Sequence, residues 1–419
     1  MTGPISVEQA RQHVLSMVRV LDSERISLSE SLGRVLAEDA LSDIDVAPFD
    51  NSAMDGFAVR AADLALASSE QPMALDVIAD IPAGTWWDGR VGPGQAARIM
   101  TGAPVPSGAD AVVMVELTEK LSGDGGVHSK VAFSHAPEAG EHIRRRGEEV
   151  SCGDVVAAAG ERIGPATVGL LAATGHASIA VIRAPRVAVL STGDELVEID
   201  QKPGPGKIRN SNSYSLAAQV QAAGGIALRY GIVPDDLSAT SAAFAQAAAE
   251  ADYIITSGGV SVGEFDFIKP ALEKIGRLEF HQVAMRPGAP QTMGSVNGVP
   301  VFGLPGNPTS SFVGFEIFVR PALRKMQGLA ELDRPKVTAT LLHDVRKKPG
   351  RRYYLRGRLA AAQDGAGLSV ELSGSQSSAL LTAAHRGNCF IVLEQGESSF
   401  PAGTQVECLR LDVEEGVAL

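Results

Sequence analysis

Residues 186–326 alternate between short apolar runs, most of which end at a glycine, and longer segments of helical character. The runs "RVAVLSTG", "ALRYGIV", "DYIITSGG" and "VPVFGLPG" read as strands, and "NSYSLAAQVQAAGG" and "LSATSAAFAQAAAEA" read as helices. Apolar strands that alternate with helices are typical of a mostly parallel sheet with helices on both faces. The alternation therefore predicts a central doubly wound α/β domain, for which we expect the bounds 184–328.

Three loops of this region directly follow predicted strands: "STGDEL" (191–196), "SGGVSVGEFDF" (257–267) and "LPGNPTSS" (304–311). In open α/β sheets, ligands bind at the carboxyl ends of the strands. Backbone N–H groups of glycine-rich loops bind anions there, although strand-to-helix turns also need glycine for geometry alone. Three such loops on one edge favour an anion site. Its candidate residues in the first two loops are Ser191, Thr192, Gly193, Ser257, Gly258 and Gly259.

Six carboxylates fall at or just after the predicted strand ends, namely Asp194, Glu195, Asp235, Asp236, Glu264 and Asp266. Asp194 and Asp236 are the first candidates for a structural role at helix N-termini. The remaining carboxylates would repel a bound phosphate unless a cation lay between them. Mg²⁺ binds carboxylate and phosphate oxygens together, so the pattern predicts a Mg²⁺-dependent site for a phosphate or nucleotide ester.

The segments on either side of the α/β region have a different texture. Glycine and proline separate short apolar runs such as "ARIM" and "AVVMVE", which predicts a β-rich subdomain at 48–145. Residues 1–47 and 146–183 are expected to form a linker subdomain of helix and strand. It opens with the helical segment "VEQARQHVLSMVRVL", preceded by a capping-box pattern. The runs "KVTATLL", "RRYYLRGRL" and "CFIVLE" predict a small all-β, barrel-like domain at 329–419.

Composition excludes several classes of protein. The net charge of −12 argues against a dedicated nucleic-acid binder, and no apolar run approaches the length of a membrane helix. The first residues lack the features of a signal peptide, and the three cysteines are scattered, so we expect a cytoplasmic protein. The eight histidines show no spacing typical of a zinc site.

Several longer strings carry a resemblance to a known family. They are "PFDNSAMDGFAVR" (48–60), "RIMTGAPVPSGADAVVM" (98–114), "RRRGEEV" (144–150), "STGDEL", "SGGVSVGEFDF" and "GLPGNPTSS" (303–311). In order and spacing the chain resembles the MoeA-type molybdopterin molybdenumtransferases, and it is similar also to the C-terminal domain of gephyrin. The likeness extends from the first predicted helix to the terminal β domain.

The resemblance implies an activity and an assembly. Members of the family insert molybdate into the dithiolene of adenylylated molybdopterin, with Mg²⁺-dependent loss of AMP, as the last step of molybdenum cofactor biosynthesis. The family forms elongated homodimers, in which the active cleft lies between the α/β domain of one protomer and the β domains of the other. Molybdopterin adenylyltransferase and apo-molybdoenzymes are possible protein partners on the same basis, whereas nucleic acid and membrane are not expected.

Matching motif positions assign roles to single residues. The resemblance implies that Asp55, Glu195, Asp235 and Asp266 are catalytic and that the last three also hold Mg²⁺. Besides the loop residues already named, the expected substrate-binding residues are Thr101, Glu149, Arg286, Pro305, Gly306, Asn307, Pro308, Arg351 and Ser378.

Some of these residues have structural alternatives. Asp55 precedes Gly56, and an aspartate in that position ordinarily caps a turn. The run Arg144–Arg146 has two interpretations, a solvated strand edge or a phosphate contact. Arg351 alternates with Arg352, Arg356 and Arg358 along a predicted strand, so only one face of that strand can point into a cleft.

Two departures from the family pattern concern charge. The family's K-P-G-K-P string is "RPGAP" here, with Arg286 and Ala289 in place of two lysines. Loss of a charge-assisted contact to an oxyanion costs about 1.5–3 kcal/mol, so Ala289 predicts weaker binding of molybdate or a specialised paralogue. The family's D-S-N string begins with Asn210, which removes one negative charge.

Two other functions remain open at this point. The first is molybdopterin adenylylation, because the adenylyltransferase has a domain similar to residues 186–326; that enzyme would lack the flanking β domains. The second is a gephyrin-like scaffold with weak activity, for which the acidic cluster would tolerate neutralisation.

Overall fold

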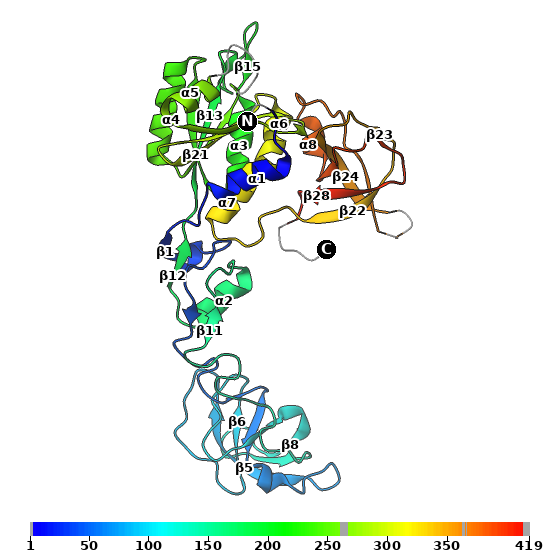
Figure 1. Ribbon diagram of the computed structural model, residues 1–419. Helices are drawn as coiled ribbons and strands as arrows, with labels where there is room; N and C mark the ends of the chain where they lie inside the picture. Colours follow the sequence, from blue (N-terminus) through cyan, green and yellow to red (C-terminus); the bar gives the residue numbers. More distant parts are fainter. Residues whose placement is uncertain (1–2, 260–266, 363–364, 366, 414–419) are drawn as a thin grey trace.

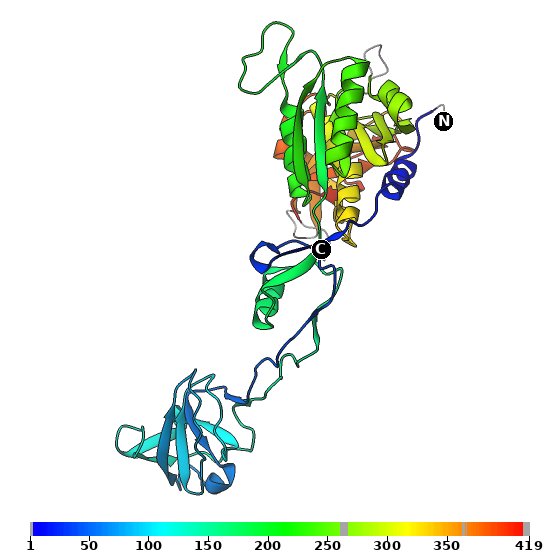
Figure 2. The same cartoon turned by 90° about the vertical axis from the view of Figure 1, so that its left-hand side faces the viewer.

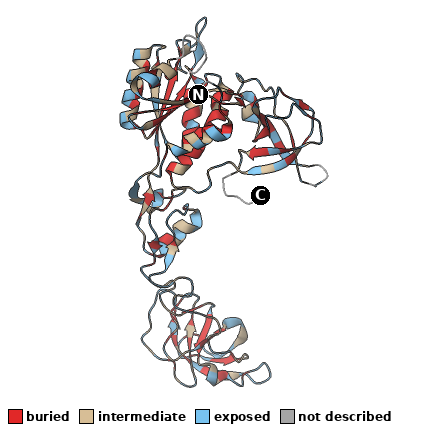
Figure 3. Ribbon diagram, in the orientation of Figure 1, coloured by how far each residue is buried: buried red, intermediate tan, exposed pale blue. Residues whose placement is uncertain are grey.

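The computed structural model describes residues 3–259, 267–362, 365 and 367–413. The molecule is elongated: the α/β domain and the C-terminal barrel lie together at one end, and a separate β domain lies at the other, beyond a narrow linker (Figures 1 and 2). Buried residues gather separately in these bodies (Figure 3). Within the described ranges, no helix has the length and apolar character needed to cross a bilayer.

The α/β domain is built on a six-stranded sheet of order β16-β13-β17-β21-β20-β18. Its first four strands are parallel, which confirms the predicted doubly wound, mostly parallel fold. The other two strands form an antiparallel edge that the alternation did not predict, because that segment contains two consecutive strands without a helix between them. The bounds are Ile226–Val233, Arg186–Thr192, Tyr253–Ser257, Val299–Leu304, Pro290–Val296 and Arg277–Gln282, in sheet order.

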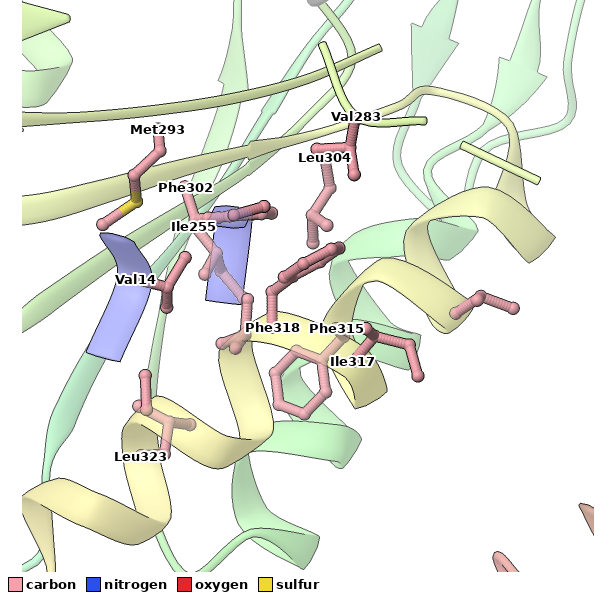
Figure 4. Close-up of a cluster of buried hydrophobic side chains, with 14 of the residues drawn as sticks. Val14, Ile255, Val283, Met293, Phe302, Leu304, Phe315, Ile317, Phe318 and Leu323 are labelled. Carbon is pink, nitrogen blue, oxygen red and sulfur yellow. The ribbon is translucent and has the colours of Figure 1, made fainter. Parts of the chain in front are cut away.

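Alternation of side chains along the central strands places a core on each face of this sheet. Val187 and Val189 belong to one core, and Ala188 and Leu190 belong to the other. The first core contains aromatic side chains of β21 and of the helical segment after it, among them Phe302 stacked on Phe318 (Figure 4). The helices over this face are α3 (Ser211–Ala222), α6 (Pro308–Gly314) and α7 (Arg320–Met326), and those over the other are α4 (Leu237–Glu250) and α5 (Ile268–Ile275).

Ser6 is the N-cap of the N-terminal helix α1 (Val7–Ser16), and the predicted capping box between Ser6 and Gln9 is present. It packs into the first core through Val7, Ala10 and Val14, although it precedes the linker in sequence. The helix ends before the apolar segment "VEQARQHVLSMVRVL" does. Beyond it the chain is extended, because the Leu21 N–H donates to the carbonyl of Met326 and Val18 is buried against the same core.

The linker consists of paired strands that run to and from the distant β domain. β1 (Ser23–Ser27) pairs with β12 (Ser178–Ile182), and β2 (Ala40–Leu41) pairs with β11 (Val155–Ala157). Helix α2 (Pro165–Ala173) packs beside them. The distant domain holds a six-stranded sheet of order β7-β4-β6-β5-β9-β8 and the small pair β3–β10. Their bounds are Ala111–Met114, Gly56–Val59, Gln95–Ile99, Met73–Ile81, Lys130–Phe133, Thr118–Ser122, Asn51–Ser52 and Ile143–Arg144.

The C-terminal domain is a closed five-stranded barrel, as predicted. Its strands follow the order β24-β25-β22-β28-β26, and β26 pairs back to β24. The short strand β19 of the α/β domain adds to β24, which joins the two domains. The bounds are Arg352–Ala361, Leu368–Leu372, Lys336–Leu341, Gln405–Arg410 and Cys389–Leu393 for the barrel and Met285–Arg286 for β19; the smaller elements are β23 (Val345–Arg346), β27 (Ser399–Phe400) and α8 (Thr382–Arg386).

Candidate functional site

A cavity of about 560 Å³ lies at the carboxyl ends of the parallel strands, where the α/β domain meets the barrel. It draws its walls from all three predicted loops, from the segment around β19 and from the barrel. The predicted site residues that line it are Thr192, Gly193, Glu195, Asp235, Gly258, Gly259, Arg286, Pro305, Gly306, Asn307, Arg351 and Ser378. The sheet therefore brings together residues that are far apart in sequence.

The three loops are in direct contact. The Gly258 N–H donates to the carbonyl of Leu304 at 3.1 Å, which joins the second loop to the third. Gly258 has a φ of +96°, and a Cβ there would lie 2.4 Å from the Thr192 carbonyl oxygen. This position requires glycine for both conformation and space, so the glycine serves the close approach of the loops. The Thr192 hydroxyl is buried and has no hydrogen-bond partner in the part of the chain that is described.

The acidic residues separate into two kinds. Glu195 and Asp235 line the cavity. Asp236 does not, because its carboxylate caps α4 by accepting from the backbone N–H groups of Ser238 and Ala239. Asp194 is also used structurally: its N–H donates to the Asp235 carboxylate at 3.2 Å, and the Asp235 N–H donates back to the Asp194 carboxylate at 3.3 Å. This reciprocal pair holds the loops after β13 and β16 together and orients Asp235.

Two expected acidic residues, Glu264 and Asp266, lie outside the described residues. Among the residues that are described, no group of three or more histidine, cysteine, aspartate or glutamate side chains is arranged to hold a metal ion. Two carboxylates, Glu195 and Asp235, do face the same cavity. Mg²⁺ is commonly bound by one or two protein carboxylates together with water and substrate phosphate oxygens, so this donor set fits it.

The barrel contributes the opposite wall of the cavity, through Arg351 and Ser378. The Ser378 carbonyl accepts from the Thr309 N–H at 3.0 Å, and the Thr309 hydroxyl donates to the carbonyl of Leu380 at 2.8 Å. These bonds fasten the barrel loop to the start of α6, directly after the third strand-end loop. Arg352, the first residue of β24, does not line this cavity and pairs with Glu8 and Glu394.

The two departures from the family pattern have different surroundings. Arg286 and Ala289 both line the cavity. The Arg286 guanidinium lies over the ring of Tyr353, 5.5 Å from its centroid, and donates to its hydroxyl at 3.4 Å. Asn210, in contrast, is buried behind the cavity wall. It caps α3 by accepting from the Ser213 N–H, and it also accepts from the Ser191 hydroxyl at 3.0 Å.

Three further predicted residues lie behind the wall rather than on it. Ser191 and Ser257 are buried, and Pro308 is the first residue of α6. The hydroxyl of Ser257 accepts from the Asn212 side-chain amide at 2.7 Å. Sequence reasoning also missed lining residues that lie in or beside the "RPGAP" string, in the third loop or beside Ser378. These are Met285, Pro287, Gly288, Pro290, Ser310 and Gln376.

Asp55 directly precedes β4 and Thr101 follows β6, both strands of the distant β domain, and Glu149 follows β10, so none of the three lines this cavity within one chain (Figure 1). Asp55 accepts from both the N–H and the hydroxyl of Thr101, at 2.7 Å each. The backbone hydrogen bond from Thr101 and then the hydroxyl bond lower the pKa of Asp55 below its usual value. The Asp55 carboxylate is therefore held in its ionised form at an exposed position of that domain.

The three arginines of the run 144–146 are all exposed. Arg145 pairs with Asp50 and Arg146 with Asp45, both at exposed positions, in keeping with a solvated edge. Arg144, Arg145 and Glu149 line another cavity, of about 550 Å³, in the distant domain.

Comparison with known proteins covers the whole length of the chain. Residues 5–175 match the MoeA N-terminal region (domain I and II), residues 188–325 match a probable molybdopterin binding domain, and residues 338–411 match the MoeA C-terminal region (domain IV). A molybdopterin molybdenumtransferase of Bacillus subtilis is 39% identical over 99% of this chain and 95% of its own length. One from Haemophilus influenzae is 38% identical over 96% and 97%.

A solved structure agrees with these relatives. The molybdopterin biosynthesis MoeA protein of Pyrococcus horikosii superposes with a TM-score of 0.82 at 31% identity, and the likeness covers 98% of this chain and 100% of that one. The shared fold therefore includes the distant β domain, the α/β domain and the barrel.

Proposed function

Because the chain belongs to the MoeA family of molybdopterin molybdenumtransferases, we propose that the cavity between its α/β domain and its barrel is where molybdate meets adenylylated molybdopterin. The enzyme acts at a late step of molybdenum cofactor biosynthesis. The observation that carries the proposed site is the convergence of the three strand-end loops with Arg351 and Ser378 on a single cavity.

The cavity offers groups of both signs, as the proposed substrates require. Arg286 and Arg351 supply positive charge for oxyanions, and the Thr192 hydroxyl is available as a hydrogen-bond donor. The glycines of the second and third loops let backbone approach the ligand closely. The dithiolene sulfurs belong to the substrate, so the protein's part is positioning and electrostatic stabilisation.

Glu195 and Asp235 are the described residues that would hold Mg²⁺. When bound there, the ion would neutralise charge on the phosphate oxygens of the adenylyl group as AMP leaves. The reciprocal contact with Asp194 fixes the loop position of Asp235, which limits the reorganisation needed on binding. Asp266 is proposed as a third acidic group on family resemblance alone.

The distant domain completes the proposal if two chains associate. Asp55, Thr101 and Glu149 lie too far along the elongated chain to reach the cavity of their own protomer. We propose a homodimer in which this ionised Asp55 and its neighbours face the cavity of the partner. The elongated shape and the separation of the two halves of the predicted site support this arrangement.

The test is incubation with adenylylated molybdopterin, molybdate and Mg²⁺. Release of AMP together with reconstitution of an apo-molybdoenzyme is the expected result. ATP-dependent adenylylation of molybdopterin instead would indicate an adenylyltransferase, and absence of both reactions in a correctly folded protein would leave a scaffold role.

A further inference from the structure

A second cavity, of about 490 Å³, lies beside the first and is enclosed mainly by the barrel. It shares Arg286, Pro287 and Gln376 with the first cavity. Its other walls come from the segment around β23 and from β24. The lining residues there include Arg346, Lys347, Lys348, Tyr353, Leu355 and Arg356.

The lining of this cavity is strongly basic. Arg286, Arg346, Lys347, Lys348 and Arg356 contribute five cations, against a single carboxylate from Asp344. In the described part of the chain, none of the five has a carboxylate within ion-pair distance. The Asp344 carboxylate instead accepts a hydrogen bond of 2.8 Å from the backbone N–H of Ala402.

Arg356 is the most unusual of these cations because its side chain is almost fully buried, with a relative exposure of 1%. Its Nη1 and Nη2 reach only the carbonyls of Tyr354 and Ser377, at 3.3 and 3.5 Å, and its Nε has no partner. Burial, and then repulsion by Arg286, lowers the pKa of Arg356 to about 10. A buried cation that lacks a counter-charge is costly, and a bound anion would offset that cost.

Tyr353 holds two of the other cations in place. The Lys347 Nζ lies 5.2 Å and the Arg286 guanidinium 5.5 Å from its ring centroid. Its hydroxyl accepts from the backbone N–H of Lys348 at 3.3 Å. Lys347 is itself only 8% exposed, and its Nζ donates to the Arg351 carbonyl. Charged donors that are already ordered bind an anion with less loss of conformational entropy.

We propose that this cavity is a second binding site, which adjoins the first and shares Arg286 with it, for a small dianionic oxyanion held mainly by Arg356 and Lys347. The shared chemistry is a tetrahedral dianion, either a free inorganic ion or the phosphate end of a monoester. Among the described residues these cations have no carboxylate within ion-pair distance, and the cavity is large enough for the ion and its remaining water. The site does not depend on the transfer reaction proposed above.

Titration calorimetry of the full-length protein tests the site with sodium sulfate, inorganic phosphate and phenyl phosphate as separate probes. Lys347→Met should weaken binding by about tenfold, as expected for loss of one charge-assisted contact. Lys348→Gln, at an exposed position, should weaken anion binding by a smaller factor. This second variant keeps the test valid if Lys347→Met fails to fold. Arg358→Gln is the control, because it removes one charge from β24, the strand that carries Arg356, at an exposed position outside the cavity.

The first cavity must be told apart from the second. Arg351→Gln should affect only oxyanion binding at the first, so a loss confined to that variant would overturn the proposal while leaving the first site intact. Crystals soaked in selenate should show anomalous density beside Arg356. Absence of density there, or unchanged binding in Lys347→Met, would also overturn it. Tighter binding of phenyl phosphate than of sulfate would identify a monoester as the ligand, and the reverse order would identify a free oxyanion.

Discussion

The side-chain amide of Asn212 lies 2.8 Å from the carbonyl oxygen of Gly306 and donates a hydrogen bond to it. The same amide nitrogen donates to the hydroxyl of Ser257 at 2.7 Å. One buried side chain at the start of α3 therefore ties the strand end of β17 to the loop after β21. The shape of the cavity depends on this relationship, because Gly258 and Gly306 of these loops line it.

Asn212→Asp should destabilise this arrangement. The substitution replaces a donor with a carboxylate oxygen that faces another acceptor in a buried place, at a cost of about 1–3 kcal/mol. We expect the melting temperature to fall by a few degrees and the activity to fall with it. Asn297→Asp, the same change in an exposed turn, is the control. Equal melting temperatures for the two variants would contradict the structural role.

The neighbouring residues Asp235 and Asp236 provide a matched pair of variants that tests the Mg²⁺ site. Asp235→Asn removes a charged ligand from the cavity, so the Mg²⁺ concentration for half-maximal AMP release should rise by about tenfold or more. Asp236→Asn should leave that concentration unchanged, since asparagine caps a helix as well as aspartate does and Asp236 does not line the cavity. The proposal fails if both variants need the same Mg²⁺ concentration as the wild type.

Ala289→Lys should strengthen the use of molybdate. Ala289 lines the cavity beside Arg286, and a lysine there would add a cation facing the proposed oxyanion. One charge-assisted contact corresponds to about one to two decades in the KM for molybdate. Ala289→Met, of similar length but without charge, separates the charge from the added bulk. An unchanged molybdate dependence in Ala289→Lys would show that the missing lysine is not limiting.

Mixing Asp55→Asn with Asp235→Asn, at a Mg²⁺ concentration at which each variant alone is inactive, tests the shared site. Asp55→Asn and Asp235→Asn alter residues that lie in different bodies of the molecule. If each site combines one protomer's cavity with the partner's β domain, mixed dimers contain one intact site. We expect the co-refolded mixture to recover about a quarter of the wild-type rate, provided that chains pair at random. Mixed dimers that form without any recovery would exclude a site shared between protomers.

The ion pair between Arg183 and Asp252 joins the linker to the α/β domain and gives a pH prediction. Two hydrogen bonds of 2.6 Å connect the side chains. Burial is the largest single effect and raises the pKa of Asp252, but the hydrogen bonds from the Arg183 side chain and the Arg186 N–H, together with the charges of both arginines, outweigh it, so the pKa lies below its usual value. A lowered native pKa means that the stabilisation is complete above the unfolded value, about 3.9, and is lost as the pH falls through the native value.

Asp252→Asn should therefore lower the melting temperature at neutral pH and reduce its dependence on pH below about 4. The loss at neutral pH should be about 1–3 kcal/mol, as for a hydrogen-bonded charge. Asp200→Asn, at an exposed site, should change neither quantity. Parallel pH profiles for wild type and Asp252→Asn would show that this pair does not contribute.

Local patterns predicted much of the fold. The period of apolar residues identified the parallel strands, and the Ser6–Gln9 pattern located the start of α1. The antiparallel edge formed by β18 and β20 was missed, because two short strands in succession break the alternation on which the prediction depended. The end of α1 was also missed, since burial of Val18 against the α/β core favours an extended chain over further helix.

The sequence by itself determined that strand-end glycine loops and carboxylates would meet at one edge of a parallel sheet, because strands that are joined by crossover helices run in the same direction. Only the tertiary structure decided which carboxylates reach the cavity: Asp235 faces it, whereas the adjacent Asp236 caps α4. The sequence also did not predict the basic cavity of the barrel, because that cavity forms only through tertiary contacts. Arg356 was expected only as one of several alternating arginines along a strand, and Lys347 carried no signal in the sequence. The closing of the barrel and its contact with β19 bury both side chains, with no carboxylate within ion-pair distance among the described residues.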